Sequence, residues 1–175
     1  MFCIEDKNFL TEKQKDFIDN IVLGSNFPFF VNNYTVNKDD GQTFLNHTVL
    51  HRPEERNKTT MFNPYLKSFE EIFDTFCTNN NINYEEILRC SVNLTYFIGN
   101  HIANIHHDHY YDYKQLLIYL NQPEGGDTVI LDEDKETEIK RIKPEKYKGV
   151  TFDRQWHYQT YPRYGRRVLA VYTYR

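Results

Sequence analysis

Cysteine is scarce in this sequence, with only Cys3, Cys77 and Cys90 among 175 residues. Their number is odd, no two stand in a Cys-x-x-Cys pair, and their spacing matches no zinc-ligand pattern. A disulfide framework and a cysteine-based zinc module are therefore not expected. We interpret the three residues as reduced, buried thiols of a cytoplasmic protein.

Long hydrophobic runs are also missing. No segment approaches the length of a membrane span, and the first residues carry charge too early for a secretory signal, so no membrane partner is expected. The net charge of −4 leaves no general basic footprint, which makes nucleic acid an unlikely partner. Repeats and low-complexity linkers are absent, and 175 residues suit a single domain spanning residues 1–175.

The hydrophobic pattern divides this domain near residue 90, with a helical and loop-rich support over residues 1–89 and a β core over 90–175. The spacing predicts helices over 11–24, capped by Thr11, and over 66–80, with a short third helix over 83–89. The apolar faces of the first two helices comprise Phe17, Ile18, Ile21 and Val22, and Phe69, Ile72, Phe73 and Phe76. Residues 43–51 are a candidate strand between polar loops over 32–42 and 52–64.

Period-two segments dominate the second half and predict about eight short strands. They cover residues 90–98, 103–110, 114–121, 126–132, 137–143, 149–153, 156–160 and 166–174. Many short strands in close succession are typical of a sandwich or barrel. With helices before them to cover one face, the fold class is α+β.

Four residues in the segment "HHDH", at 106–109, offer two candidate metal-binding pairs. On a strand, side chains alternate faces, so His106 and Asp108 would point one way and His107 and His109 the other. The second pair would suit a cupin-type site, but the glycine and glutamate which that pattern needs are missing. We therefore expect His107 and His109 to be surface or loop-packing residues.

The first pair gains a third candidate ligand from a later strand, His157. Two histidines and one carboxylate on one face of a metal leave three adjacent positions open, which suits non-haem Fe(II) that binds a co-substrate and O₂ together. A zinc hydrolase is the alternative, but it would not explain Arg167, ten residues after His157. An arginine there is suited to a bidentate pair with a co-substrate carboxylate, whereas Arg166 faces the other way.

Four motifs follow one another in the second half. They are "YFIGNHIANIHHD", with Tyr-x-x-Gly before His-x-Asp; "IYLNQPEGGDTVI", with Tyr-Leu-Asn and then Gly-Gly-acid-Thr; "IKPEKYKGVTFDRQWH", with Pro, Gly and Phe-Asp before a histidine; and "GRRV", with Gly-x-Arg. Together they resemble the Fe(II)- and 2-oxoglutarate-dependent oxygenases, on the prolyl 4-hydroxylase-like branch. The resemblance covers roughly residues 90–175, and the N-terminal half carries no such motif.

This resemblance implies a double-stranded β-helix, a distorted jelly roll, with the N-terminal helices packed on one sheet. It implies that Fe(II) is ligated by His106, Asp108 and His157. It also implies that Arg167 pairs with the distal carboxylate of 2-oxoglutarate.

Three further residues gain expected roles from the same resemblance. Thr128 and Tyr119 are expected near that carboxylate, as partners or as alternatives to one another. Tyr96 is expected to reach the co-substrate from the first strand of the β core.

The implied reaction consumes 2-oxoglutarate and O₂, gives succinate and CO₂, and hydroxylates an unactivated C–H bond, with ascorbate as a candidate reductant. The motifs favour a prolyl residue of a peptide or protein, and His51, Arg52 and Trp156 are candidates to line its cleft. One alternative is a nucleic-acid demethylase, although that branch usually has a second arginine where this sequence has Thr173. The others are a small-molecule oxygenase and a non-catalytic metal-binding jelly-roll module.

Overall fold

The computed structural model describes residues 2–36, 38, 40–58, 62–99 and 102–175, and within them twelve strands and two α-helices. The helices are α1 (Glu12–Phe17) and α2 (Leu66–Asn79). The strands are β1 (Cys3–Asp6), β2 (Phe30–Asn32), β3 (Phe44–Leu50), β4 (Ile87–Tyr96), β5 (Lys114–Tyr119), β6 (Glu124–Gly125), β7 (Thr128–Leu131), β8 (Glu138–Ile142), β9 (Gly149–Asp153), β10 (Trp156–Gln159), β11 (Pro162–Tyr164) and β12 (Arg166–Tyr174).

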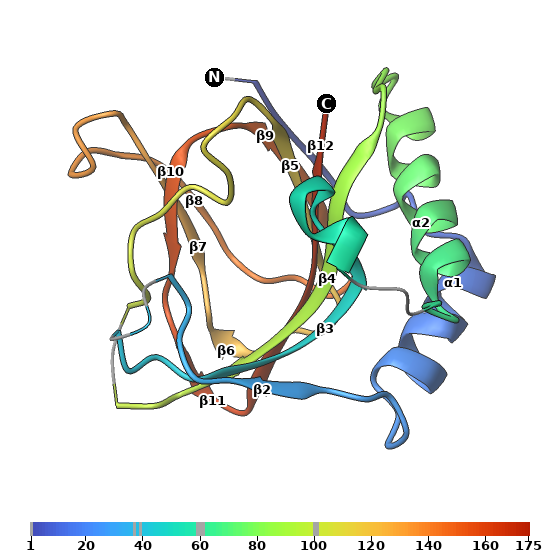
Figure 1. Cartoon of the computed structure of the whole chain (residues 1–175), viewed down its shortest axis with the longest axis horizontal. Coiled ribbons are helices and arrows are strands. Elements are labelled where there is room, and N and C mark those ends of the chain that lie inside the picture. The colour runs from blue at the N-terminus through green and yellow to red at the C-terminus, as the bar shows by residue number, and fades with distance from the viewer. Residues whose placement is uncertain (1, 37, 39, 59–61, 100–101) are drawn as a thin grey trace.

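The strands form one large sheet and two small ones, and every pairing is antiparallel. The large sheet has seven strands in the order β1-β9-β5-β12-β4-β3-β2, and the small sheets are β10-β7-β8 and β11-β6. Figure 1 shows α1 and α2 on one side of the large sheet and the small sheets facing its other side. The expected helical cover on one sheet is therefore present.

Alternation along the central strand β12 separates two hydrophobic cores. Val168, Ala170 and Tyr172 belong to the core that includes the α2 side chains, whereas Leu169 and Val171 belong to a second core shared with the small sheets. Because successive side chains of a strand point to opposite faces, one strand serves both layers. The odd-numbered face of β12 is the one that carries Arg167 into the interior.

The first helix begins where the sequence predicts. The Thr11 hydroxyl accepts a hydrogen bond from the Gln14 N–H, and the Gln14 side chain accepts one from the Thr11 N–H, a complete capping box. From Ile18 to Val22 the helix widens into a π-helical turn. The extra residue in that turn rotates Ile21 outward, where it is 44% exposed, so its predicted place on the buried face is wrong.

The predicted third helix over residues 83–89 is not formed. The N–H groups of Glu85 and Glu86 instead donate to the carbonyl of Arg175, and β4 begins at Ile87. A segment this short has few helical hydrogen bonds to repay helix nucleation. Pairing of β4 with β12 provides more backbone hydrogen bonds, so the sheet prevails.

The predicted strand over residues 103–110 is not formed. The segment makes only isolated contacts with β10, a bridge between His106 and His157 and a hydrogen bond from the Ala103 N–H to the Gln159 carbonyl. The second of the predicted loops, over residues 52–64, contains a short 3₁₀ helix, Pro53–Lys58. Residues 37 and 39 of the first predicted loop, over 32–42, and residues 59–61 of the second lie outside the described residues. All three cysteines are free, and Cys77 and Cys90 are buried as expected, but Cys3 is only half-buried. Among the described residues no helix is long and apolar enough to span a membrane.

We expect the aromatic packing between α2 and the large sheet to carry much of the stability. Phe73 is fully buried and contacts the rings of Tyr84, Tyr172 and Tyr174. Phe73→Ala should lower the free energy of unfolding by about 3–5 kcal/mol because it leaves a cavity there. Glu70→Ala on the exposed side of the same helix should change it by less than about 0.5 kcal/mol. Urea denaturation of both variants would test this, and equal losses would contradict it.

Candidate metal centre

An isolated backbone bridge joins the two segments that carry the candidate histidines. The His106 N–H donates to the His157 carbonyl at 3.0 Å, and the His157 N–H donates to the His106 carbonyl at 3.1 Å. The bridge brings the two rings together, with their centroids 4.6 Å apart. It ties the irregular segment before β5 to strand β10 of the small sheet.

Three side chains converge at this bridge, namely His106, Asp108 and His157. One possible ligand atom from each lies within 4.8 Å of the other two, the only such group among the described residues. The His157 Nε2 and Asp108 Oδ2 atoms are 3.5 Å apart. Neighbouring ligands of a metal about 2.1 Å away lie about 3 Å apart, so a small adjustment would let these atoms share one ion.

Both histidine rings are already oriented for metal binding. The Nδ1 atom of His106 lies 2.8 Å from the Asn104 carbonyl, and that of His157 lies 2.9 Å from the Gln155 carbonyl. A carbonyl only accepts, so in each ring Nδ1 carries the proton and Nε2 keeps its lone pair. The donor set therefore fits a divalent ion bound by two imidazoles and one carboxylate.

Asp108 is held on both carboxylate oxygens. Arg89 Nη1 lies 3.0 Å from Oδ1, and the Gln115 amide nitrogen donates to Oδ2 at 2.6 Å. Burial opposes ionisation of Asp108, but its contacts with His157 and Arg89 hold its pKa well below the usual range. Burial, reinforced by the charge of His157, lowers the pKa of His106 to about 4. The site therefore presents an ionised carboxylate and a neutral imidazole at neutral pH.

Arg167 lies in the same cavity and is 3% exposed, and its guanidinium has only neutral hydrogen-bond partners among the described residues. Its Nη2 donates to the Thr128 hydroxyl at 2.8 Å, and its Nη1 donates to the Gln159 side-chain oxygen. The Tyr119 hydroxyl also donates to the Thr128 oxygen, at 2.7 Å. Thr128 and Tyr119 thus extend one hydrogen-bonded chain from Arg167. A buried cation without an acidic partner is costly, so the Arg167 guanidinium is suited to pairing with an anionic ligand.

A glycine makes room for the Arg167 side chain. Gly126 has a φ of +82°, and a Cβ built on it would lie 3.0 Å from Arg167 Cδ. A side chain at this position would be strained and would crowd the arginine. The sequence "GGDT" therefore positions both the guanidinium and its hydroxyl partner Thr128.

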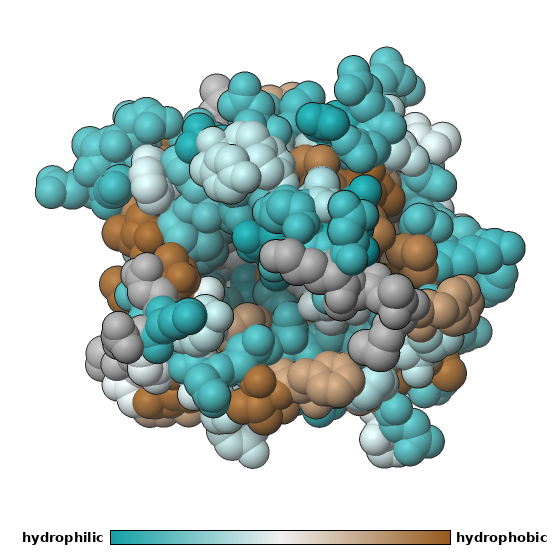
Figure 2. Space-filling view, in the orientation of Figure 1, coloured by the Kyte–Doolittle hydropathy of each residue, from teal (hydrophilic) through white to brown (hydrophobic). Residues whose placement is uncertain are grey.

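The three candidate ligands and Arg167 line one cavity of about 690 Å³ between the large sheet and the small ones. Figure 2 shows its mouth as a hollow surrounded mostly by hydrophilic residues. Leu117, Leu169 and Val171 give the floor an apolar surface. The cavity is larger than a small dicarboxylic acid needs, so a second molecule has room beside it.

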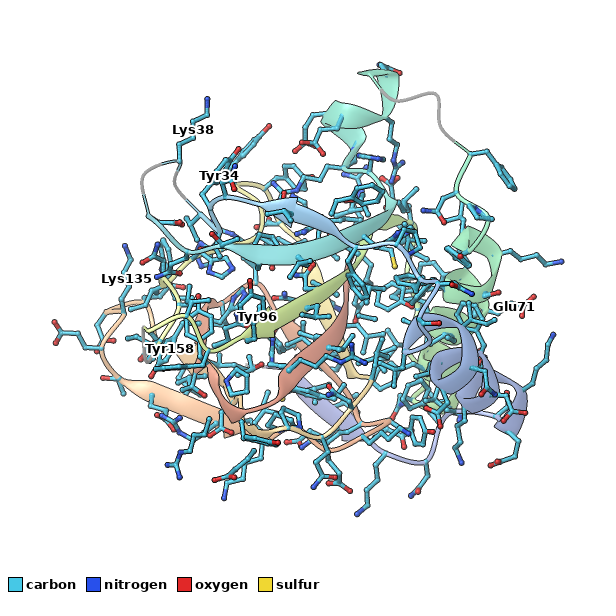
Figure 3. The ribbon with its side chains drawn as sticks, turned by 90° about the horizontal axis from the view of Figure 1, so that it is seen from below. Tyr34, Lys38, Glu71, Tyr96, Lys135 and Tyr158 are labelled. Atoms are coloured by element: carbon cyan, nitrogen blue, oxygen red, sulfur yellow. The ribbon has the colours of Figure 1, made fainter. Side chains whose placement is uncertain are left out.

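The structure corrects two of the predicted cavity residues. Tyr96 pairs with Arg166 on the outer face of the sheet and is 39% exposed, while its neighbour Thr95 lines the cavity opposite Arg167. Figure 3 marks the place of Tyr96 on its strand. Trp156 does not line the cavity; instead it stacks on His107 with ring centroids 3.8 Å apart.

Other predictions agree with the structure. His51 and Arg52 do line the cavity. His107 packs against Trp156, and His109 is buried with its Nε2 atom 2.8 Å from the Thr173 hydroxyl, so both have packing contacts as expected.

Three polar residues that contact Asp108 or Arg167 escaped sequence analysis, namely Arg89, Gln115 and Gln159. Period two along β5 places Gln115 on the same face as Leu117, so its strand position carried a usable signal. Arg89 lies just before the predicted start of its strand, and nothing in the local pattern links it to Asp108. Gln159 meets Arg167 only because β10 lies opposite β12.

Solved structures of known proteins resemble this chain over nearly its whole length. A 2-oxoglutarate–Fe(II) oxygenase family protein from Burkholderia pseudomallei has a TM-score of 0.75 at 16% identity, covering 98% of this chain and 84% of its own. A prolyl hydroxylase from Trichoplax adhaerens, solved with a hypoxia-inducible factor peptide fragment, has a TM-score of 0.64 at 17% identity. The match covers 98% of this chain and 82% of the Trichoplax chain. A Pseudomonas putida prolyl-4-hydroxylase has a TM-score of 0.59 at 13% identity, and the match covers 99% of this chain and 91% of the Pseudomonas chain.

No protein-family model matches the sequence, and neither does any curated protein. At 13–17% identity the structural likeness concerns the fold. The chain has the fold of the Fe(II)- and 2-oxoglutarate-dependent oxygenases, the family that its motifs resemble.

The buried His109 should make metal-free protein sensitive to acid. Burial, with the charge of Arg52, lowers the pKa of His109 to about 4, whereas an exposed histidine titrates near 6.5. The folded state therefore keeps the ring neutral, and the stability it contributes is present above pH 6.5 and is lost as the pH falls towards 4. The loss from this one residue should be about 3 kcal/mol.

His109→Gln keeps a polar group beside Thr173 but cannot ionise. Urea denaturation of metal-free protein between pH 7 and 4 should show a shallower fall in the unfolding free energy for this variant. Parallel pH profiles for variant and wild type would contradict the prediction.

Proposed function

We propose that this protein is an Fe(II)- and 2-oxoglutarate-dependent dioxygenase that hydroxylates an unactivated C–H bond and releases succinate and CO₂. The observation that carries the proposal is the meeting of two sites in one cavity. One is the group His106, Asp108 and His157, and the other is the buried cation Arg167, which forms no ion pair with any residue that the structure describes. A metal with open positions beside an anion clamp is what binding of a 2-oxo acid requires.

In this proposal His106, Asp108 and His157 hold Fe(II), and the chain 1–175 forms a single double-stranded β-helix domain. Once bound, the metal would supply O₂ activation coupled to decarboxylation of the co-substrate. The seven-stranded sheet and the sheets opposite it support a jelly-roll arrangement. Ascorbate would serve as an auxiliary reductant, and the free cysteines agree with a reducing, cytoplasmic setting.

The chain's own residues have separable tasks. The carbonyls of Asn104 and Gln155 keep both imidazoles in the tautomer that leaves Nε2 unprotonated. Arg167, assisted by Thr128, would bind the carboxylate farthest from the keto group, and Tyr119 orients Thr128. The apolar floor excludes water from the space beside the metal ligands, which strengthens the electrostatic contacts there.

We further propose a prolyl residue of a peptide or protein as the substrate. The resemblance of the motifs supports this, as does the likeness to a Trichoplax prolyl hydroxylase that was solved with a peptide fragment. The net charge of −4 disfavours the nucleic-acid alternative. Thr173, where a second arginine would be expected, has its hydroxyl occupied by the buried His109.

Binding of the metal and of 2-oxoglutarate should depend on different residues. With Mn(II) as a redox-inactive probe, His106→Ala should abolish tight metal binding in calorimetry. Arg167→Gln should leave metal binding intact and weaken 2-oxoglutarate binding to the Mn(II) protein roughly 100-fold, because the buried cation that would pair with the 2-oxoglutarate carboxylate is lost. Arg166→Gln is the matched control, since this neighbour is exposed on the opposite face. If the two arginine variants bind 2-oxoglutarate alike, the anion clamp is misassigned.

Turnover is the decisive test of the enzyme. Wild-type protein with Fe(II), ascorbate and air should convert 2-oxoglutarate to succinate, faster when a proline-containing peptide is present. His106→Ala and Arg167→Gln should lose this activity, and Arg166→Gln should keep it. An inactive wild type that also fails to bind 2-oxoglutarate would favour a non-catalytic metal-binding module instead.

A further inference from the structure

We propose that Arg52, with Arg89 beside it, forms a second anion-binding subsite on the substrate side of the cavity. Its ligand would be a carboxylate carried by an acidic residue next to the hydroxylated residue of a peptide substrate. The inference rests on the proposed function and names a chemical class within it.

Backbone pairing places the two arginines next to one another. Leu50 at the end of β3 pairs with Cys90 of β4, so the chain that leaves β3 through Arg52 runs past Arg89. The Arg56 guanidinium fastens this segment by donating to the carbonyls of Ile87 and Leu88, at 2.8 and 3.1 Å. Both Arg52 and Arg89 line the cavity that holds the metal ligands.

The two arginines have unused donors. Arg89 directs Nη1 to Asp108, and its side chain makes no other hydrogen bond among the described residues. Arg52 makes no side-chain hydrogen bond or ion pair with any residue that the structure describes. Glu55 lines the same cavity, but its carboxylate faces His51, with Oε2 4.0 Å from Nδ1. A guanidinium with free donors is suited to a bidentate carboxylate contact.

A charge balance of the cavity supports an anionic substrate. Its described lining residues include three cations, Arg52, Arg89 and Arg167, and two anions, Glu55 and Asp108. When the histidines are neutral, the net charge of these lining residues is therefore +1. Fe(II) and doubly ionised 2-oxoglutarate add +2 and −2, so the loaded cavity keeps an excess of one positive charge. A substrate with one carboxylate would neutralise it, and complementary charge of this kind favours binding and the correct orientation.

The wall around the two arginines is suited to a peptide backbone. Asn46 and Thr48 of β3 and Asn93 of β4 line this side of the cavity, whereas the leucines and Val171 line the floor. Amide and hydroxyl side chains can both donate to and accept from peptide groups. The arginine subsite, this polar wall and the apolar floor would together hold an extended acidic peptide.

The test uses four blocked peptides in two matched pairs. They are acetyl-Glu-Pro-Gly-amide against acetyl-Gln-Pro-Gly-amide, and acetyl-Gly-Pro-Glu-amide against acetyl-Gly-Pro-Gln-amide. Each is titrated calorimetrically, without O₂ and at low salt, into protein already saturated with Mn(II) and 2-oxoglutarate. In at least one pair the carboxylate peptide should bind wild type roughly tenfold tighter than its amide counterpart.

Variants assign the preference to Arg52. Arg52→Gln should abolish it, and Arg52→Lys should retain part of it because the charge remains. Arg163→Gln should retain it fully, since that side chain is 82% exposed and does not line the cavity, yet the change in net charge is the same. Thermal denaturation of each variant confirms that it is folded before the titrations.

The outcomes separate this inference from the proposed function. If 2-oxoglutarate does not bind the Mn(II) protein, the proposed function fails at the first step of the experiment. If 2-oxoglutarate binds but both pairs bind equally, or no peptide binds, the acidic-substrate inference alone is overturned. A preference that persists in Arg52→Gln would overturn the assignment to this arginine.

Discussion

The site depends on the strict alternation of side chains along the central strands of the large sheet. On β12, Ala170 and Tyr172 pack towards α2, and Arg167, Leu169 and Val171 face the cavity. The helices bury the first set of side chains, so the strand cannot shift its register by one residue without exposing that core. The same hydrophobic packing that stabilises the fold therefore holds a charged guanidinium inside it.

Buried charge is the cost of this arrangement, and the site handles it in two ways. Asp108 is compensated by Arg89 and by a hydrogen bond from Gln115, and its contacts with His157 and Arg89 keep its pKa well below the usual range. Within the described part of the chain Arg167 has only neutral partners, so its charge is available to a ligand. One buried ion is thus satisfied by the protein, whereas the other is left to be satisfied by what binds.

The low sequence identity to the similar structures is understandable, because the fold and the site constrain the residue type at few positions. A sheet sandwich needs apolar residues at alternate positions and small residues at a few turns, and many sequences meet that demand. The chemistry needs far fewer positions, and their spacing is what the motifs preserve. Substrate choice rests on the cavity walls, which differ freely between proteins of one fold.

The sequence alone determined most of the β core and the candidate ligands His106, Asp108 and His157, because strand periodicity and short motifs are local. Local pattern failed over residues 83–89 and 103–110, where strand pairing with β12 and a bridge to His157 decided the conformation. The family resemblance placed Tyr96 at the co-substrate, whereas the sheet turns its neighbour Thr95 to the cavity. Only the tertiary structure decided that Arg89 meets Asp108 and that Arg52 lies beside Arg89, because those contacts join segments whose proximity no local pattern encodes.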